Sequence, residues 1–280
     1  MSPARTGPAA TGAACRLSVN PLTTPGWTLD QDLALCRTLG LTRTSISMDK
    51  LARAGPAEQV ALRIAEADMR VDIVYPATLL DMTRPETWAE AQERLSAAVE
   101  VAASMGAGGL LLAGGAGHGL SWEEAASRFA VAVDTVAALG RQRGVKVLLE
   151  AVRPQFAYAS FVHSFRDAVA VASDLDLGLV FDITHCWWEP QLDEILTQNI
   201  DRIGSVHIAD LPLDRPATGR LVPGDGELPI GRLLSVLLGA GYTGPLELEL
   251  IGPAIDAEGY QAATSRAVRY TREILERIES

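Results

Sequence analysis

Cysteine and histidine are scarce in this chain of 280 residues, which contains three cysteines and four histidines. Cys15, Cys36 and Cys186 do not have the spacing of a thiolate metal site, and an odd number of cysteines does not form a complete disulfide set. This usage is typical of reduced thiols and not of a disulfide-stabilised secreted fold. We therefore expect a cytoplasmic protein with free cysteines.

Positive charge is also scarce, since 24 Lys and Arg residues stand against 35 Asp and Glu residues and give a net charge of −11. A nucleic acid or an anionic membrane surface requires a positive protein face, so both are disfavoured as partners. A local basic pocket for a phosphate or a carboxylate is still compatible with this charge. No apolar run approaches the roughly 20 residues of a membrane helix, and the N-terminal segment lacks the apolar core of a signal peptide. We expect a soluble protein with a small-molecule partner.

Short apolar segments alternate with longer amphipathic segments along most of the chain. The spacing predicts strands at residues 16–20, 43–48, 70–75, 109–113, 145–149, 178–181, 203–208 and 246–250. It predicts helices at residues 28–39, 56–69, 88–105, 121–143, 165–173, 192–198, 230–240 and 260–278. Eight strand-then-helix units are typical of a (β/α)₈ barrel. We therefore predict the α/β class, with a single (β/α)₈ TIM barrel over residues 15–280 and a flexible tail over residues 1–14.

A doubly wound sheet is the structural alternative. Such a sheet has fewer strands and places a phosphate-binding glycine loop after its first strand. The first predicted strand is instead followed by Asn20-Pro-Leu-Thr-Thr, and the glycine-rich residues 114–119 follow the fourth strand without a dinucleotide or P-loop spacing. The barrel fits better, and we interpret residues 114–119 as a flexible loop.

The fifth to eighth predicted strands each end in a carboxylate or an imidazole. These strand-end residues are Glu150, Asp182, His207 and Glu249. Side chains alternate along a barrel strand, and leucines at positions 246, 248 and 250 on the outer face turn Glu247 and Glu249 inward. Barrel enzymes build their sites at the C-terminal ends of the strands, and adjacent strands lie about 4.8 Å apart. We therefore predict that the four side chains meet in one quadrant of the barrel mouth.

Three carboxylates that meet there would repel one another unless a cation lies between them. Carboxylate and imidazole ligands without a thiolate suit Mn²⁺, Co²⁺, Mg²⁺ or Zn²⁺, and we place Mn²⁺ first. Each residue by itself has an ordinary explanation, such as a helix N-cap for Asp182, a structural histidine or a solvated glutamate. Their equivalent positions on four successive strands favour a metal site for the set. Glu247, one layer deeper, is predicted to be a structural partner and not a ligand.

Short motifs surround these strand ends. They are Glu150 after VKVLL, Asp182 and His185 in FDITH, His207 in SVHIAD, PGDGE at residues 223–227, and YTGPLELE ending at Glu249. Together they resemble the xylose isomerase-like superfamily of sugar isomerases and epimerases, which includes ketose 3-epimerases, hydroxypyruvate isomerases, and inosose dehydratases and isomerases. The motifs cover the fourth to eighth strands, and the first three strands match only in their general pattern. As a set the motifs are specific for the superfamily and not for one substrate.

The resemblance implies that the four strand-end residues hold one divalent metal ion. It also implies that Glu150 and Glu249 are an acid/base pair, one on each side of the substrate. His185 would hydrogen-bond substrate oxygens, and an arginine after the seventh strand, Arg215 or Arg220, would assist it. Many relatives form dimers or tetramers, so the resemblance also implies a homo-oligomer.

Other residues near the predicted mouth have two interpretations each. Trp187 and Trp188 either form a substrate wall, because sugar C–H faces stack on indole, or pack against the next helix. Arg153 either reaches a substrate carboxylate or phosphate or lies on the loop surface. His118 and His163 are predicted to be loop residues without a role in binding.

The chemistry of the predicted ligands agrees with the resemblance. Removing a proton next to a carbonyl gives an enediolate, and a metal that chelates the carbonyl and the adjacent hydroxyl oxygen stabilises its charge. One carboxylate can take the proton, and a second can return it on the other face or to the neighbouring carbon. We therefore predict a metal-dependent isomerase or epimerase that acts on a keto-sugar or related polyol.

Four alternatives are weighed against this prediction. A metal-dependent dehydratase of a cyclic ketopolyol, of the inosose or dehydroshikimate type, is the runner-up, and loss of water from the product would identify it. A zinc AP endonuclease needs several zinc ions, many histidines and a basic DNA face, which four histidines and a charge of −11 disfavour. A non-catalytic barrel is disfavoured because an unused carboxylate cluster is costly. A secondary-metabolite enzyme stays open, because fold and metal do not fix the substrate.

Overall fold

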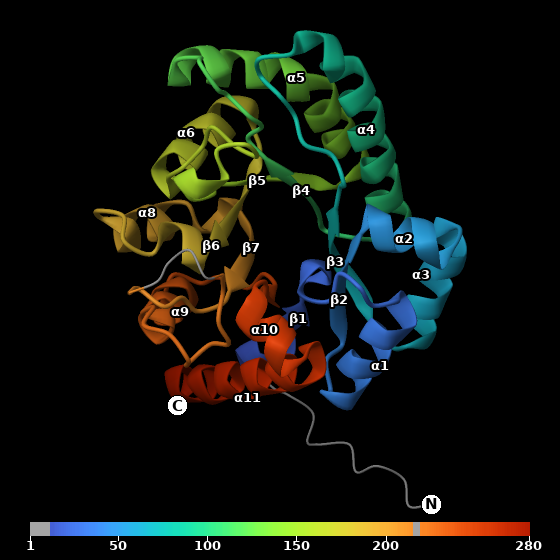
Figure 1. Cartoon of the computed structure of the whole chain (residues 1–280), viewed down its shortest axis with the longest axis vertical. Coiled ribbons are helices and arrows are strands. Elements are labelled where there is room, and N and C mark those ends of the chain that lie inside the picture. The colour runs from blue at the N-terminus through green and yellow to red at the C-terminus, as the bar shows by residue number, and fades with distance from the viewer. Residues whose placement is uncertain (1–11, 215–218) are drawn as a thin grey trace, which may run out of the picture.

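The strands of the protein form one eight-stranded parallel sheet in a computed structural model that describes residues 12–214 and 219–280. They are β1 (Leu17–Val19), β2 (Arg43–Ser47), β3 (Arg70–Tyr75), β4 (Gly109–Ala113), β5 (Lys146–Glu150), β6 (Gly178–Asp182), β7 (Ile203–Ile208) and β8 (Leu246–Leu248). Each strand pairs with its neighbour in the chain from β2 to β8, and β8 pairs with β1. Because β1 also lies beside β2, the sheet curls into a nearly closed barrel (Figure 1).

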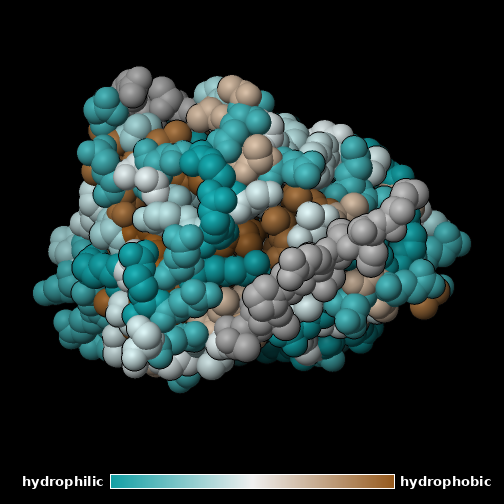
Figure 2. All heavy atoms as spheres, turned by 90° about the horizontal axis from the view of Figure 1, so that it is seen from below, coloured by the Kyte–Doolittle hydropathy of each residue, from teal (hydrophilic) through white to brown (hydrophobic). Residues whose placement is uncertain are grey.

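Helices cover the outside of this barrel (Figure 1). The helices of the described residues are α1 (Leu29–Thr38), α2 (Met48–Ala54), α3 (Ala57–Glu66), α4 (Trp88–Ser104), α5 (Trp122–Arg143), α6 (Phe165–Leu175), α7 (Ile183–Cys186), α8 (Leu192–Gln198), α9 (Ile230–Gly239), α10 (Pro253–Glu258) and α11 (Tyr260–Glu279), of which the short α7 and α10 follow the ends of β6 and β8. The prediction of a single TIM barrel is confirmed. On the face shown in Figure 2, polar residues predominate and apolar residues lie mostly in the recesses between them. Within residues 12–214 and 219–280, no helix has the length and apolarity that a membrane crossing requires.

Helix α5 shows how local sequence sets the boundaries of these elements. The Ser121 hydroxyl accepts a hydrogen bond from the Glu124 backbone N–H at 3.2 Å, and the Glu124 carboxylate accepts one from the Ser121 N–H at 2.9 Å. This is the capping box that the sequence predicts. The helix ends at Gly144, whose φ of 70° is left-handed and favours glycine.

Three short helices and the start of the folded domain differ from the prediction. Helices α2, α7 and α10, of seven, four and six residues, were not predicted, because segments this short carry at most two turns of a helical pattern. Residues 12–14 were assigned to the tail but lie in a 3₁₀ turn (Gly12–Arg16) in which Ala13 and Ala14 are buried. The Ala13 N–H donates to Glu279 Oε1 at 2.6 Å, which fixes this turn to the last helix. The rest of the predicted tail, residues 1–11, lies outside the described residues.

Leu148 fills the interior of the barrel below the strand ends. A Cβ atom added to Gly109, Gly178 or Gly204, on three other strands of the barrel, would lie only 2.5–2.7 Å from a Leu148 methyl group. A cavity of about 370 Å³ that Leu148 and Gly204 help to line opens at the N-terminal ends of the strands. Glu150 follows Leu148 on the same face of β5, one layer higher. Leu148 therefore separates this lower cavity from the strand ends above it.

Candidate metal centre

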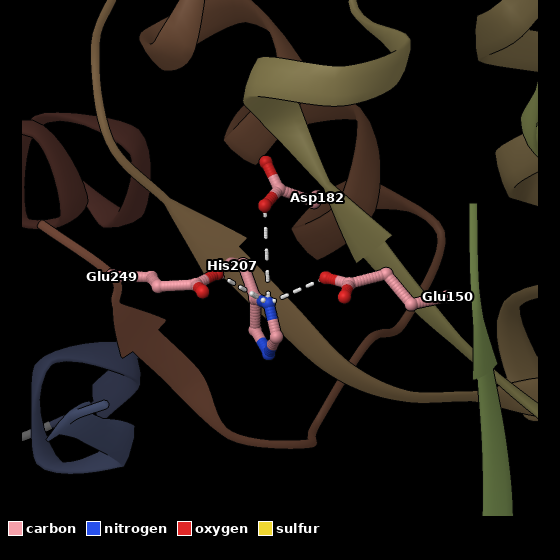
Figure 3. A group of neighbouring side chains, drawn as sticks. All are labelled: Glu150, Asp182, His207 and Glu249. Carbon is pink, nitrogen blue, oxygen red and sulfur yellow. Dashed lines mark ion pairs between the residues drawn. The ribbon is translucent and has the colours of Figure 1, made fainter. Parts of the chain in front are cut away.

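Four buried side chains converge at the C-terminal ends of successive strands (Figure 3). They are Glu150 on β5, Asp182 on β6, His207 on β7 and Glu249 just after β8. One ligand atom from each residue lies within 4.8 Å of the ligand atoms of the other three. These four residues, called the ligand cluster below, are the strand-end residues that the sequence places together.

His207 Nδ1 lies at the centre of the ligand cluster. Glu150 Oε1 and Glu249 Oε2 lie 2.8 and 2.9 Å from it, and Figure 3 shows that the two carboxylates approach from opposite sides. Asp182 Oδ2 lies 3.9 Å from the same nitrogen. The four atoms therefore surround a single small volume.

Two of these ligand atoms, Glu150 Oε1 and His207 Nδ1, are buried without a hydrogen-bond partner, and a third, Asp182 Oδ2, has only its ion pair with Arg220. The carboxylate oxygens near Nδ1 are close enough for hydrogen bonds but do not lie in the direction that an N–H bond requires. Buried polar atoms are almost always hydrogen-bonded, so two adjacent exceptions call for another partner. A divalent cation fits, because oxygen and imidazole nitrogen atoms are its usual ligands.

Without a metal ion, the buried carboxylates of the ligand cluster favour protonation of Glu150 and of His207. Burial raises the pKa of Glu150 to about 7, and the neighbouring Glu249 and Asp182 carboxylates add to the rise. Burial acts to lower the pKa of His207, but Glu150 and Glu249 raise it well above its ordinary value. The carboxylates therefore require positive charge at the imidazole, and a metal ion held at Nδ1 meets the same requirement.

Arg220 supplies a second positive charge to this site. Its guanidinium lies 2.8 Å from Asp182 Oδ2, 2.7 Å from Glu249 Oε2 and 3.3 Å from His185 Nε2. Burial acts to raise the pKa of Asp182 and of Glu249, but Arg220 lowers both. Asp182 and Glu249 are therefore the ionised carboxylates of the ligand cluster.

Asp182 uses its two carboxylate oxygens differently. Oδ1 accepts hydrogen bonds from the Thr184 N–H at 2.6 Å and the Thr184 hydroxyl at 2.7 Å, and so caps α7. Oδ2 is the oxygen that faces the ligand cluster. The helix cap is therefore present and uses Oδ1, so it does not exclude the predicted ligand role of Oδ2.

The far side of the His207 ring is held by a buried polar group. Nε2 lies 2.9 Å from the Tyr75 hydroxyl and 3.2 Å from Glu247 Oε2, which are two acceptors for its N–H. The Tyr75 hydroxyl donates to Glu247, and Asn20 Nδ2 donates to Tyr75 at 2.7 Å. A proton kept on Nε2 leaves Nδ1 free as a ligand atom. Glu247 thus contacts the ring from behind, and its own oxygens are outside the ligand cluster.

Asn20 and Tyr75 were not predicted as site residues. Asn20 directly follows β1 and Tyr75 ends β3, so both obey the strand-end rule that identified the ligand cluster. The rule was applied only to carboxylates and imidazoles, so neutral polar side chains were missed.

The loop between β7 and α9 brings Arg220 to the site. Asp210 and Leu221 exchange two backbone hydrogen bonds, of 3.0 and 2.8 Å, which bring the chain back beside β7. The buried Asp210 carboxylate accepts from the Gly224 N–H at 2.9 Å and the Leu228 N–H at 3.0 Å. A Cβ atom at Gly226 would lie 2.4 Å from Asp210 Oδ1, so this close approach requires glycine. The PGDGE segment therefore closes around Asp210 and fixes the loop that carries Arg220.

Other predicted substrate residues lie at different depths. His185 is buried beside Arg220, and burial lowers its pKa to about 4, so the ring is neutral at physiological pH. Trp187 packs against the hydrophobic core, whereas Trp188 is half exposed. His118 is exposed, and the His163 ring lies 2.9 Å from the Val152 carbonyl oxygen.

Arg153 is buried at the same end of the barrel, and its guanidinium lies 5.5 Å from the centre of the Phe156 ring. The loop-surface interpretation of Arg153 is therefore wrong. Arg215, the other arginine predicted to contact substrate, lies outside the described residues. The three cysteines are free, Cys15 exposed and the other two buried.

Comparison with known proteins supports the predicted resemblance. The sequence model of the family described as "Xylose isomerase-like TIM barrel" matches residues 23–274. An inosose isomerase of Halalkalibacterium halodurans is 28% identical over 142 residues, which are 48% of this chain and 48% of that protein. The matched segment thus spans about half the length of this curated relative.

Solved structures match the whole barrel. The IolI protein with a bound zinc atom superposes with a TM-score of 0.81 at 20% identity, covering 94% of this chain and 98% of that one. An L-ribulose 3-epimerase gives a TM-score of 0.75 at 20% identity, covering 95% and 96%. A protein of Sinorhizobium meliloti gives 0.80 at 22% identity, covering 95% and 98%. At these identities the likeness shows a shared fold.

Proposed function

Since the chain belongs to the xylose isomerase-like TIM barrel family, we propose that it is a divalent-metal-dependent isomerase or epimerase of a keto-sugar or related polyol. The observation that carries the proposal is the ligand cluster, in which two glutamates face each other across His207 Nδ1. The relatives named as an inosose isomerase and an L-ribulose 3-epimerase support the reaction class.

The ligand cluster would hold one divalent ion, with Mn²⁺ as the first choice and Co²⁺, Mg²⁺ or Zn²⁺ as alternatives. When bound, the ion would stabilise the negative charge of the enediolate that forms when a proton is removed next to a carbonyl. Tyr75 and Glu247 would hold the His207 ring so that Nδ1 stays directed at the ligand cluster.

Proton transfer is the role proposed for Glu150 and Glu249. They lie on opposite sides of the ligand cluster (Figure 3), so one carboxylate can remove a proton while the other returns it on the opposite face or to the neighbouring carbon. Glu249 is kept ionised by Arg220, which makes it suited to be the base. Glu150, buried and without a hydrogen bond to Oε1, is the member that more readily carries a proton.

Substrate positioning is the role proposed for His185 and Arg220. The neutral His185 ring can donate a hydrogen bond from one nitrogen and accept one at the other, which suits a sugar hydroxyl. Arg220 contacts His185 and two members of the ligand cluster, so it can orient a substrate oxygen next to the reacting carbon. Trp187 packs against the core, so its role in a substrate wall stays a prediction.

The test is metal-dependent exchange of the substrate α-proton with solvent deuterium, followed by NMR on a panel of ketoses and ketocyclitols. We expect exchange with the metal-loaded protein, none after chelation, and a loss of at least a hundredfold in Glu150→Gln and in Glu249→Gln. Metal content is measured in both variants, because each removes a ligand charge as well as a base. Full activity of either glutamine variant would refute the acid/base assignment. A product lighter by one water would identify the dehydratase alternative.

A further inference from the structure

The residues that the structure describes include three buried arginines, and Arg153 differs from the other two. Arg43 forms two hydrogen bonds, of 2.7 and 2.5 Å, with the Asp72 carboxylate. Arg220 binds Asp182 and Glu249. Arg153 is only 6% exposed, and its guanidinium has no carboxylate or hydrogen-bond partner among residues 12–214 and 219–280.

An unpaired cation is costly to bury. Charged side chains that are removed from water are normally paired or hydrogen-bonded, because desolvation costs several kcal/mol per ion. The Nε atom of Arg153 is completely buried without an acceptor. The Phe156 ring, 5.5 Å from the guanidinium, compensates only part of this cost. Arg153 therefore lacks a direct ion pair or hydrogen bond among the described residues, although the Asp182 carboxylate acts on its charge from a greater distance.

Arg153 belongs to the same end of the barrel as the ligand cluster. It follows Glu150 by three residues, and the Phe156 ring that it covers packs edge-on against the His185 ring at 5.7 Å between centres. Arg153 also interacts electrostatically with Arg220 and with Asp182. The repulsion between two neighbouring guanidinium groups would be relieved by an anion that lies beside them.

We propose that Arg153 binds an anionic group of the substrate, a carboxylate or a phosphate, so that the site acts on an acidic or phosphorylated α-hydroxyketone in preference to a neutral one. The proposal rests on the proposed function and specifies its substrate class. A guanidinium presents a planar fork of N–H groups that matches two oxygens of either anion. The overall charge of −11 disfavours anions at long range, so the preference would arise from this local contact.

The test uses three small α-hydroxyketones without stereocentres, so that sugar configuration does not affect the result. They are dihydroxyacetone, hydroxypyruvate and dihydroxyacetone phosphate, whose ends are neutral, carboxylate and phosphate. For each compound, binding to the metal-loaded protein is measured by calorimetry, and solvent exchange of the C–H protons next to the ketone is measured by NMR. The proteins are wild type, Arg153→Gln and, as a control, Arg166→Gln, which removes an exposed arginine from the start of α6.

We expect at least one of the two anions to bind wild type and Arg166→Gln about tenfold to a hundredfold more tightly than dihydroxyacetone. The anion that binds more tightly identifies the group. Arg153→Gln should lose this preference and leave the affinity for dihydroxyacetone unchanged. It should also keep the thermal midpoint of the ligand-free protein, because it removes a buried charge without a partner.

Two failures are distinguishable. If exchange occurs but both anions bind no better than dihydroxyacetone, or their advantage survives in Arg153→Gln, the anion proposal is wrong and the proposed function stands. If none of the three compounds exchanges or binds in a metal-dependent manner, the proposed function itself fails. A large fall in the thermal midpoint of Arg153→Gln would show that Arg153 has a structural role instead.

Discussion

Replacing Glu247 with glutamine tests whether the group behind His207 controls the metal site. Glu247 is completely buried, and its Oε2 lies 3.2 Å from His207 Nε2 and accepts a hydrogen bond from Tyr75. Glutamine has nearly the same shape and keeps an oxygen acceptor, but it removes the negative charge. The imidazole then becomes a weaker ligand, because its Nε2–H no longer faces a carboxylate.

The expected loss is about tenfold in metal affinity. Hydrogen bonds that involve a charged group are roughly twice as strong as neutral ones, so changing one partner from carboxylate to amide costs about 1–1.5 kcal/mol. A tenfold change in a binding constant corresponds to about 1.4 kcal/mol. The ligand cluster itself is intact in this variant, so metal binding should be weakened and not abolished.

The assay is competition for Mn²⁺ or Zn²⁺ against a chelating dye, at fixed pH and ionic strength. Glu194→Gln, which removes one exposed carboxylate from α8, is the control for the change in net charge and should bind metal as wild type does. An unchanged dissociation constant in Glu247→Gln would refute the reasoning. A lower thermal midpoint with normal metal affinity would assign Glu247 a purely structural role.

Three further predictions concern stability and reactivity. Leu148→Ala should destabilise the protein by about 3 kcal/mol, because it leaves a cavity between three glycine-containing strands, and chemical denaturation would measure this loss. Gly226→Ala should destabilise the protein by about 1–3 kcal/mol, because its new Cβ would lie 2.4 Å from a carboxylate oxygen. Gly231→Ala is the control and should not destabilise the protein, because no neighbour lies closer than 3.9 Å to its new Cβ. Equal thermal midpoints of the two variants would contradict this prediction. Burial raises the pKa of Cys36 to about 12, so its thiol stays protonated and unreactive at pH 8–9, and a thiol reagent should modify only the exposed Cys15 before unfolding.

The strand ends were predictable because two regular patterns coincide there. Alternation along a strand turns every second side chain inward, and parallel strands in a barrel place their C-terminal ends at one face. These rules brought Glu150 and His207 together although 57 positions separate them (207 − 150). They also placed Glu247 one layer below Glu249, which agrees with its contact to the far side of the His207 ring.

Loop residues were much less predictable. Arg220 reaches Asp182 and Glu249 only because the PGDGE segment folds around Asp210. No periodic pattern encodes such a contact, since it depends on hydrogen bonds between a buried carboxylate and backbone N–H groups. The sequence therefore left Arg215 and Arg220 as alternatives; the structure places Arg220 at the site, and Arg215 lies outside the described residues.

The sequence by itself determined the barrel, the order of its strands and the residue types that meet at its mouth, because periodicity and strand direction are local properties that repeat along the chain. Only the tertiary structure decided how the charges of the site are compensated. Pairing depends on which side chains from distant loops come within a few ångströms in a buried, low-dielectric environment. Arg220 is neutralised by two carboxylates there, whereas Arg153, equally buried, has none among the described residues.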